Sequence, residues 1–426
     1  MISRKAAVKI VNIYGLVLPL LIFSLYFLQV FISNVHPAFF ATLLAVPFIL
    51  FGFLYFLSLH LSLIDFFAYG YIFWCCISGF FTIYNGYPYL LFIKQICYSV
   101  IPIFFFFIGK SKKETTSFIL LGYLLASFFC FICGFIWVIT KPQYYITYLS
   151  SYIYKFNLIY WLAEPRMNSF LGSICVGILG PISAWISFVC VRKTKKKFLF
   201  YLLFLFCEVA SVASFQRFSY AMSLIILLLF LSYSLIDKTV RKYGIITIAA
   251  IIVAICLLLC FSPDLLNSVL SKFSSFSSAF SDRSYQWSYV FSLGGTIIFG
   301  RGLGTFSHAA IGYTSELVTD GAFINILGET GVIGALLFSI IVILSIVSFF
   351  KNRRNDISVV CFGIVSIFLL ASLGSNSFLY PVLAPLFWLS LGGMNFEAVP
   401  KWGVCAIAIL ATRAGDACPS DYQHQM

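Results

Sequence analysis

The chain has 426 residues, of which 62% are apolar and only 10% are charged, and its net charge is +13. This composition excludes a water-soluble globular protein, because so few charges do not keep a chain of this length dispersed. Nucleic acid is also excluded as a partner, since most of the positive excess lies in short segments between apolar runs, where it sets membrane topology.

Apolar runs of roughly 20 residues, the length that crosses a bilayer as a helix, follow one another along the chain. They predict an all-α bundle of about 12 transmembrane helices, with a single domain over residues 1–400 and a cytoplasmic tail over 401–426. The first run is too long for a cleaved signal core, so we expect it to remain as a helix. The predicted spans are 9–32, 38–58, 61–83, 89–108, 117–139, 167–191, 198–213, 219–236, 244–262, 327–350, 357–374 and 378–394.

Basic residues between the spans predict the orientation of the bundle. Each basic cluster follows an even number of spans and so lies on the same side as the basic N-terminus, which the positive-inside rule assigns to the cytoplasm. Both termini are then cytoplasmic. The clusters are Lys110, Lys112 and Lys113; Arg192, Lys193, Lys195, Lys196 and Lys197; Lys238, Arg241 and Lys242; and Lys351, Arg353 and Arg354.

Two segments on the outer side are longer than connectors require. One covers residues 140–166, and the other is a large external loop over 263–326, just before the tenth span. Connections between adjacent helices are usually short, and long ones are often functional. We therefore expect the functional residues of the chain in these outer segments.

The sequence predicts neither a disulfide nor a metal site. The 13 cysteines lie scattered through apolar runs, and the C-x-x-C of Cys130 and Cys133 falls inside the fifth span, where cysteine packs as a small apolar residue. The four histidines are isolated, and the outer segments offer arginine rather than a cage of carboxylates. A nucleotide-binding G-x-x-x-x-G-K-[ST] loop is missing, so we expect no cofactor.

Four arginines fall on the outer side, against the usual topological preference. The planar, bidentate guanidinium group suits phosphate oxygens at a membrane surface. Contact with lipid headgroups, or snorkelling, also explains any one of them, but it explains all four together less well. These residues are Arg166, Arg217, Arg283 and Arg301.

A few charged residues lie within the predicted spans. Glu208 is in the outer part of the seventh span, and we expect it to pair with Arg217, because an intramembrane carboxylate is normally paired. Asp65 and Lys94 lie at opposite depths of the third and fourth spans. We therefore do not pair these two and expect both to reach toward the membrane surface.

The segment 297–338 contains the densest set of candidate site residues. Gly300, Gly302 and Gly304 permit a tight turn and a close approach of the backbone to a ligand. Asp320 and Glu329 then lie before and inside the start of the tenth span. This spacing predicts carboxylates beside the arginines at the outer membrane face.

Several motifs in this part of the chain resemble the O-antigen ligase and polymerase superfamily (Wzy-type). The G-R-G-L-G turn and the E-T-G-V-I-G helix entry that begins at Glu329 are similar to the end of that family's large outer loop. Arg283 and Trp287 resemble its R-x-x-x-W segment. The P-R-M-N-S-F run containing Arg166 and the S-F-Q-R run ending at Arg217 resemble its arginine-bearing helix starts. The resemblance covers roughly residues 160–395 in order.

Aspartate at position 320 favours the polymerase branch of this superfamily. Ligases typically carry a histidine followed by a small polar residue where Asp320 and Gly321 stand here, and His308 lies too far upstream to be its equivalent. The resemblance then implies transfer of a growing glycan from undecaprenyl pyrophosphate to the terminal sugar hydroxyl of another lipid-linked repeat unit. The product is O-antigen or capsular polysaccharide at the outer face of the bacterial cytoplasmic membrane, with flippase and chain-length regulator proteins as candidate partners.

The resemblance also implies roles for individual residues. Asp320 is the expected general base and Glu329 the alternative, although a hydrogen bond that positions the acceptor explains either carboxylate as well. Arg283 would stabilise the charge on the leaving pyrophosphate. The expected substrate-binding residues are Arg166, Arg217, Arg301, Gly302 and Gly304.

Two other functions remain open at this point. An O-antigen ligase differs from a polymerase only in its acceptor. A lipid-linked oligosaccharide flippase is also often a basic twelve-helix protein, but it needs cationic residues deep inside its helices and has mostly short outer loops. A secondary transporter is a weaker alternative, because the sequence shows no internal repeat.

Overall fold

The computed structural model describes residues 4–32, 37–57, 61–155, 166–261, 267, 271, 276–307 and 319–396. Over these residues the protein is all-helical, with 82% helix and no strand. The long elements are α1 (Arg4–Gln29), α2 (Pro37–Leu57), α3 (Leu63–Tyr84), α6 (Lys113–Thr140), α8 (Ser173–Lys193), α9 (Lys197–Ala213), α10 (Arg217–Ile236), α11 (Arg241–Phe261), α14 (Ala322–Asn352) and α15 (Asp356–Ala371). The shorter ones are α4 (Tyr89–Gln95), η1 (Ile96–Val100), η2 (Ile101–Ile103), α5 (Phe104–Ser111), α7 (Gln143–Lys155), α13 (Phe276–Phe291), η4 (Gly294–Ile298), η6 (Ser377–Leu379) and α16 (Ala384–Gly393).

The length and composition of the helices identify a membrane protein. In the described part of the chain, eight helical stretches are long and apolar enough to cross a bilayer: α1, α2, α3, the run from α4 to α5, α6, α8, α10 and α14. Large apolar side chains such as Phe53 and Leu336 lie exposed on their outer surfaces, which suits contact with lipid. Helices also occupy the positions of the other four predicted spans (α9, α11, α15 and α16), but the count of twelve crossings stays a prediction.

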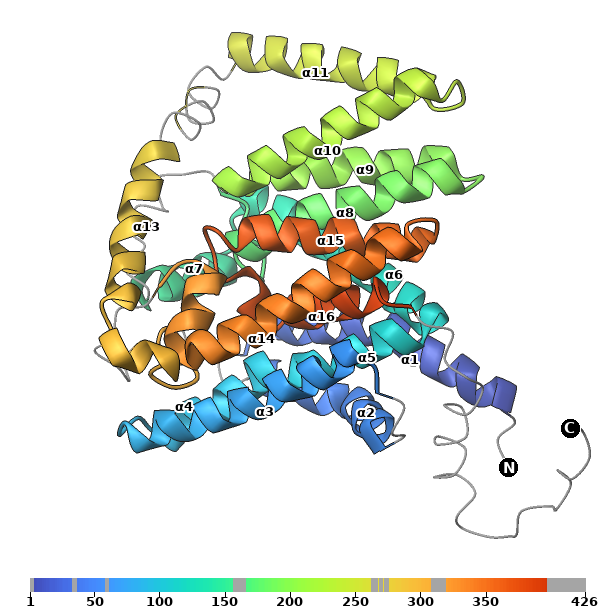
Figure 1. Ribbon diagram of the computed structural model, residues 1–426. Coiled ribbons are helices and arrows are strands. Elements are labelled where there is room, and N and C mark those ends of the chain that lie inside the picture. The colour runs from blue at the N-terminus through green and yellow to red at the C-terminus, as the bar shows by residue number, and fades with distance from the viewer. Residues whose placement is uncertain are drawn as a thin grey trace, which may run out of the picture.

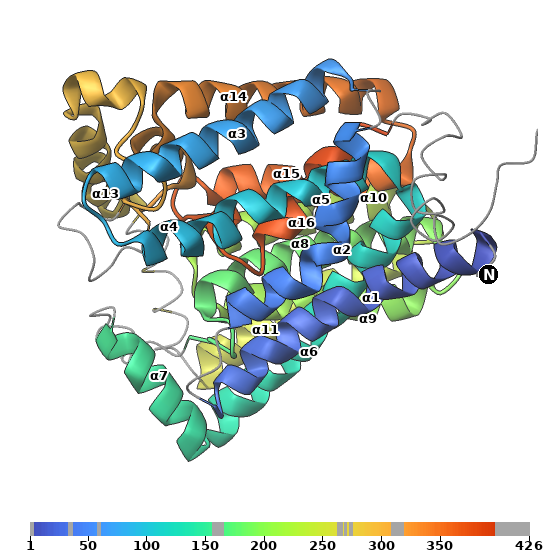
Figure 2. The ribbon, with the colours of Figure 1, turned by 90° about the horizontal axis from the view of Figure 1, so that it is seen from below.

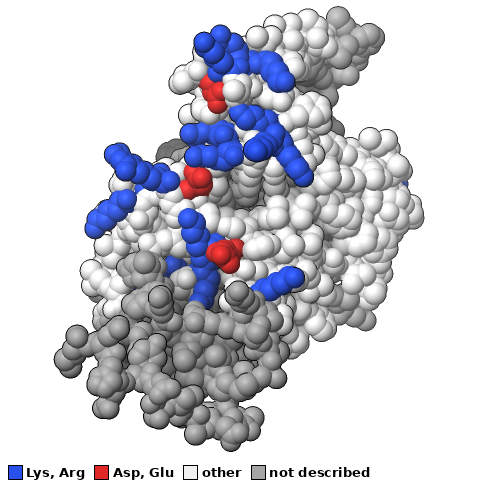
Figure 3. All heavy atoms as spheres, turned by 90° about the vertical axis from the view of Figure 1, so that its right-hand side faces the viewer, with Lys and Arg blue, Asp and Glu red and all other residues white. Residues whose placement is uncertain are grey.

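The helices lie side by side and their loops gather at two ends of the bundle (Figure 1). Figure 3 shows one end, where lysines and arginines cluster. We call it the basic end and define it by the segments 110–113, 192–197, 238–242 and 351–354. The other end, the opposite end, is defined by 85–88, 166–172, 213–217, 300–307, 319–321 and 372–377. Figure 2 shows the same bundle from below, with α1 packed along α6 and α3 along α14.

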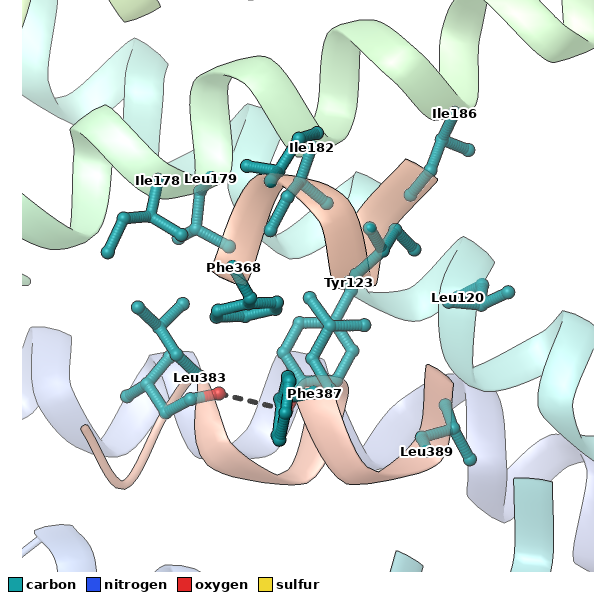
Figure 4. Packing of buried hydrophobic residues seen from close by; sticks show 14 of the residues in the cluster. Leu120, Tyr123, Ile178, Leu179, Ile182, Ile186, Phe368, Leu383, Phe387 and Leu389 are labelled. Atoms are coloured by element: carbon teal, nitrogen blue, oxygen red, sulfur yellow. Dashed lines mark hydrogen bonds between the residues drawn. The ribbon is translucent and has the colours of Figure 1, made fainter. Parts of the chain in front are cut away.

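A central core of apolar side chains joins α6, α8, α15 and α16 (Figure 4). Ile178 and Ile182 of α8, Phe368 of α15 and Phe387 of α16 are all at most 1% exposed. The hydroxyl of Tyr123 donates to the carbonyl of Val382 at 2.9 Å, so the one polar group of this side chain is satisfied. The short helix α16 is thus packed against α5 and α15.

A buried ion pair near the basic end corrects two expectations. Lys110 Nζ lies 2.7 Å from Asp65 Oδ2, and both side chains are 0% exposed. Ser62 donates to the same oxygen through its backbone N–H and its hydroxyl, at 2.9 and 2.8 Å. Asp65 therefore does not reach toward solvent, and Lys110 is not part of the exposed basic surface. The two residues are 45 positions apart, so neither their pairing nor their burial was visible in the local sequence.

The outer segments contain more helix than the sequence predicted. The segment 140–166 includes α7, and 263–326 includes α13 and η4. α14 begins at Ala322 rather than at 327, so the tenth predicted span starts five residues early. The large external loop is therefore not confirmed as a loop. The tail 401–426 lies outside the described residues.

Candidate functional site

Helix α14 is interrupted near the opposite end. Gly331 has φ 71° and ψ −173°, which divides α14 into a first half, residues 322–330, and a long second half. Such a break frees backbone carbonyls that need new donors, because none is available in a bilayer. Trp74 of α3 donates its indole N–H to the carbonyl of Thr330 at 2.7 Å, and Ser78 donates its hydroxyl to that of Glu329, also at 2.7 Å.

The glycine-rich turn, residues 300–307, supplies the remaining donors at this break. The N–H of Arg301 donates to the carbonyl of Gly328 at 2.9 Å, and that of Gly302 donates to the carbonyl of Glu329 at 3.1 Å. The turn also pairs with α3, because Thr82 donates its hydroxyl to the carbonyl of Leu303 at 2.9 Å. The turn therefore closes the gap between α3 and the broken helix.

The glycines of this turn approach the protein's own backbone rather than an open space. Gly302 has φ +113°, and a Cβ at this position would lie 2.5 Å from the backbone nitrogen of Thr82. A Cβ on Gly300 would meet the carbonyl of Glu329, and one on Gly304 would meet the side chain of Gln95. Close packing thus requires glycine here without any ligand, which differs from the close approach to a ligand that the sequence predicted.

Glu329 lies where the first half of α14 meets the turn. Its side chain is 3% exposed, and its Oε1 has no hydrogen-bond partner. The backbone N–H groups of Gly304, Phe306 and Ser307 face the carboxylate. The turn therefore surrounds a buried carboxyl group with backbone donors.

Helix α13 brings the other two predicted catalytic residues together. Arg283 donates Nη2–H to the carbonyl of Gly374 at 2.9 Å. One turn further along α13, Gln286 Oε1 accepts from the N–H of Asp320 at 2.7 Å, and Trp287 donates its indole N–H to the carbonyl of Asp320 at 3.3 Å. α13 thus contacts the backbone of Asp320 and directs the guanidinium group of Arg283 from the same face, since positions 283, 286 and 287 are spaced by about one helical turn.

The 372–377 segment binds the residues on both sides of Asp320 through hydrogen bonds. The N–H of Ala322, the first residue of α14, lies 3.0 Å from the carbonyl of Ser372 and 3.2 Å from that of Ser375. Asn376 donates to the carbonyl of Thr319 at 3.0 Å. This segment was not predicted as part of the site, although its run of small polar residues between two apolar helices, S-L-G-S-N-S, was a usable signal.

Arg301 belongs to the same neighbourhood through its backbone. Its carbonyl accepts from Asn85 at the end of α3 at 2.8 Å. Its side chain is half-buried, and Nε is buried without a hydrogen-bond partner. The structure therefore brings Arg283, Arg301, Asp320 and Glu329 into one set of packed segments at the opposite end.

Arg166 and Arg217 form a second group: Arg166 lies in the segment before α8, and Arg217 is the first residue of α10. The N–H of Met167 donates to the carbonyl of Ala213 at 2.9 Å, which ties the start of the α8 segment to the end of α9. Gln216, the residue before α10, donates to the hydroxyl of Ser173 at 2.9 Å. Both arginines are half-buried and lie at the opposite end, as their sequence positions predicted.

The expected ion pair between Glu208 and Arg217 is not among the ion pairs of the described residues. Glu208 Oε1 is buried without a partner, and the carboxylate instead faces the hydroxyl of Ser223 on α10. Ser223 in turn donates to Ser211 at 2.6 Å, so Glu208 adjoins a network of hydroxyl groups. The partner that the sequence predicted for Glu208 is therefore wrong.

His308 lies outside the described residues. In the described part of the chain, no three His, Cys, Asp or Glu side chains come together in a group that would hold a metal ion. Comparison of the chain with protein-family models and with curated proteins finds no match. The function is therefore argued from the arrangement of these residues.

Proposed function

We propose that this protein polymerises undecaprenyl-pyrophosphate-linked oligosaccharide repeat units into O-antigen or capsular polysaccharide at the outer face of the bacterial cytoplasmic membrane. The observation that carries the proposal is the arrangement around α13. This one helix holds the guanidinium group of Arg283 and the backbone of Asp320 at the end of the bundle that lies away from the basic end. By the positive-inside rule, that end faces the outside, where the lipid-linked glycan is displayed.

Arg283 has the chemistry that a pyrophosphate leaving group needs. Breaking the bond between the anomeric carbon and the phosphate oxygen places negative charge on the pyrophosphate, and preorganised donors stabilise that charge most where water is scarce. The carbonyl of Gly374 fixes the plane of the guanidinium group through Nη2. Its other N–H groups make no hydrogen bond to the described residues, and they are available for phosphate oxygens.

Asp320 is the general base of the proposal. The acceptor sugar hydroxyl must lose its proton as it attacks, and a carboxylate within hydrogen-bond reach takes it. Asp320 is half-buried, whereas Glu329 is 3% exposed and surrounded by backbone N–H groups. The more accessible carboxylate is the better candidate for proton transfer to an incoming substrate, and Glu329 is the alternative.

Of the remaining predicted residues, we assign the arginines to substrate binding and the glycines to the packing of the turn. Arg301, Arg166 and Arg217 are half-buried at the same end, and we assign them to the phosphates and the glycan. Gly302 and Gly304 contribute by closing the turn against α3 and α4, which places Arg301 beside the broken helix. No cofactor or metal takes part in this proposal, because the energy resides in the lipid-linked pyrophosphate.

Deletion of the gene followed by gel analysis of the surface polysaccharide tests the proposal against its alternatives. A single repeat unit on the lipid core indicates a lost polymerase. No surface sugar indicates a lost flippase, and an undecorated core with accumulated polymer indicates a lost ligase. Either of the last two results contradicts polymerisation by this chain.

The conservative variant Arg283→Lys tests the role of the guanidinium group. Lysine keeps the charge and membrane insertion but lacks the bidentate fork, so chain extension should be mostly lost at a normal protein level. Polymer length on a gel, with the protein quantified by immunoblot, measures this effect. The control Arg353→Lys, in an exposed loop at the basic end, should extend chains like the wild type. Wild-type polymer from a normally expressed Arg283→Ala variant would refute the role.

A further inference from the structure

Buried polar atoms without hydrogen-bond partners concentrate beside the glycine-rich turn. Among the described residues, buried side-chain nitrogen or oxygen atoms without a hydrogen-bond partner occur at several places. Six of them belong to five residues at this place: Arg301 Nε, Thr319 Oγ1, Asn325 Oδ1 and Nδ2, Glu329 Oε1 and Asn376 Oδ1. Folded proteins leave few such atoms, because each one forgoes the hydrogen bonds it made to water. Their concentration in one region therefore needs an explanation.

Four of these residues are linked through Phe306 and its neighbours, and Arg301 adjoins them because its N–H donates to the carbonyl of Gly328. The carbonyl of Phe306 accepts from the N–H of Thr319 at 3.2 Å, and the carbonyl of Thr319 accepts from Asn376 at 3.0 Å. Glu329 faces the N–H of Phe306. Asn325 precedes Glu329 by one helical turn and so lies on the same face of α14. We call Arg301, Thr319, Asn325, Glu329 and Asn376 the unsatisfied polar set.

The chemistry of the unsatisfied polar set selects one class of ligand. A phosphate accepts hydrogen bonds only, and the partnerless oxygens of Glu329 and Asn376 would repel it. A metal cation needs acceptors only, and the amide N–H groups of Asn325 and the guanidinium group of Arg301 oppose it. A hydroxyl group both donates and accepts. A ligand with several neighbouring hydroxyl groups matches this mixture of donors and acceptors.

We propose that the unsatisfied polar set binds the sugar hydroxyl groups of the lipid-linked oligosaccharide, beside the pyrophosphate that Arg283 holds. This inference rests on the proposed function and adds the place where the sugar itself is recognised. Because Asn325 is fully buried, binding requires this region to open. A site built to hydrogen-bond a hydroxyl group rejects a ligand that lacks it, since the buried groups then stay unpaired. The set therefore also determines which sugar is accepted.

The substitution Asn325→Leu separates a ligand site from a structural one. Leucine has a similar size and removes two atoms that have no partner in the resting protein. If Asn325 serves a ligand, the thermal midpoint of the purified full-length protein should stay or rise while polymer extension falls to the level of the deletion strain. If ordered water satisfies the set instead, its hydrogen bonds are lost and the midpoint should fall, which overturns the proposal.

Asn395 provides a matched control at the other end of the bundle. It is also buried, at 5% exposure, but its amide donates to Ser345 at 2.9 Å and to the carbonyl of Leu391 at 2.8 Å. Asn395→Leu therefore removes satisfied hydrogen bonds and should lower the midpoint. Equal falls for both variants, or a wild-type polymer from Asn325→Leu, contradict the inference.

A binding measurement identifies the ligand class independently of polymer formation. Thermal midpoints are recorded for the wild type and Asn325→Leu with a panel of methyl glycosides and, separately, with inorganic pyrophosphate. At least one glycoside should raise the midpoint of the wild type and not that of the variant, whereas pyrophosphate should act equally on both. No glycoside effect, or an equal effect on both proteins, overturns the sugar assignment. If the deletion strain keeps normal polysaccharide, the proposed function fails, and these midpoints still decide the role of Asn325.

Discussion

The two ends of the bundle treat buried polar groups in opposite ways. Near the basic end, Asp65 is neutralised by Lys110 and receives two further hydrogen bonds from Ser62 on the same oxygen, although its Oδ1 has no partner. At the opposite end, Asn325 and Glu329 are equally buried, but Asn325 has no side-chain partner and Glu329 Oε1 has none. The buried ion pair near the basic end is thus arranged for folding. Asn325 and Glu329 at the opposite end keep unused hydrogen-bonding capacity.

The same contrast extends to the surface loops. At the basic end, hydrogen bonds from the hydroxyl groups of Thr239 and Tyr233 lower the pKa of Asp237 to about 2. Its carboxylate therefore stays ionised and is held by residues close to it in the chain. At the opposite end, Asp320 is held by its backbone, through Gln286 and Trp287. The hydrogen bonds of Asp237 engage its side chain and stabilise the fold. Those of Asp320 engage its backbone and position its side chain for a substrate. Four substitutions test this distinction.

The largest effect is expected from Lys110→Met. It leaves the carboxylate of Asp65 buried without its counter-charge, and removing one partner of such a pair costs about 3–5 kcal/mol. The yield and the thermal midpoint of the detergent-purified protein should both fall sharply. The double variant Asp65→Leu, Lys110→Met should recover much of the loss, because both charges are then gone. A single variant as stable as the wild type would show that the pair does not stabilise the fold.

Asp320→Asn should change activity rather than stability. Asparagine keeps the size and the hydrogen bonds of the backbone but does not accept a proton, and general-base assistance contributes about 10²–10⁴-fold in rate. We expect very short chains on a polysaccharide gel at an unchanged thermal midpoint. Asp237→Asn is the control from the basic end and should leave chain length unchanged. Full-length polysaccharide chains from Asp320→Asn would contradict its role as general base and leave Glu329 as the candidate.

Gly302→Ala tests the packing of the glycine-rich turn. A Cβ would meet the backbone of Thr82, and φ of +113° is strained for alanine, so the free energy of unfolding should fall by about 1–3 kcal/mol. The control is Gly295→Ala in η4, where a Cβ meets no atom within 4 Å. Denaturation of the two variants side by side measures the difference. Equal stability would mean that the turn is free to move away from α3.

The smallest effect is expected from Lys193→Ala. Its Nζ lies 2.9 Å from Asp356 Oδ1, but the two side chains are 53% and 54% exposed. An exposed pair contributes less than about 1 kcal/mol, and salt weakens it further. The thermal midpoint should change little at low salt and not at all at high salt. A fall in the thermal midpoint as large as that of Lys110→Met would show that the exposed ion pair stabilises the fold as much as the buried one.

Helix positions were largely readable from the sequence, and the site was readable only in part. Each predicted span overlaps a helix, because hydropathy over about 20 residues is a local property, but α8 and α16 begin at 173 and 384 rather than at the predicted 167 and 378. Arg166 and Arg217 were found because positive charge on the predicted outer side runs against the usual topological preference. Asn376, Trp74 and Ser78 were missed, since their importance lies in contacts with residues far away in the chain.

The sequence by itself determined that the chain is a helical membrane protein with its basic loops at one end, because apolar length and charge act through the bilayer and not through a particular partner. The tertiary structure alone decided that α14 breaks at Gly331, that the glycine-rich turn closes this break, and that Asp65 pairs with Lys110. Each of these depends on groups from separate helices that must satisfy one another's hydrogen bonds and charge away from water. That requirement is met in three dimensions, where residues distant in sequence become neighbours.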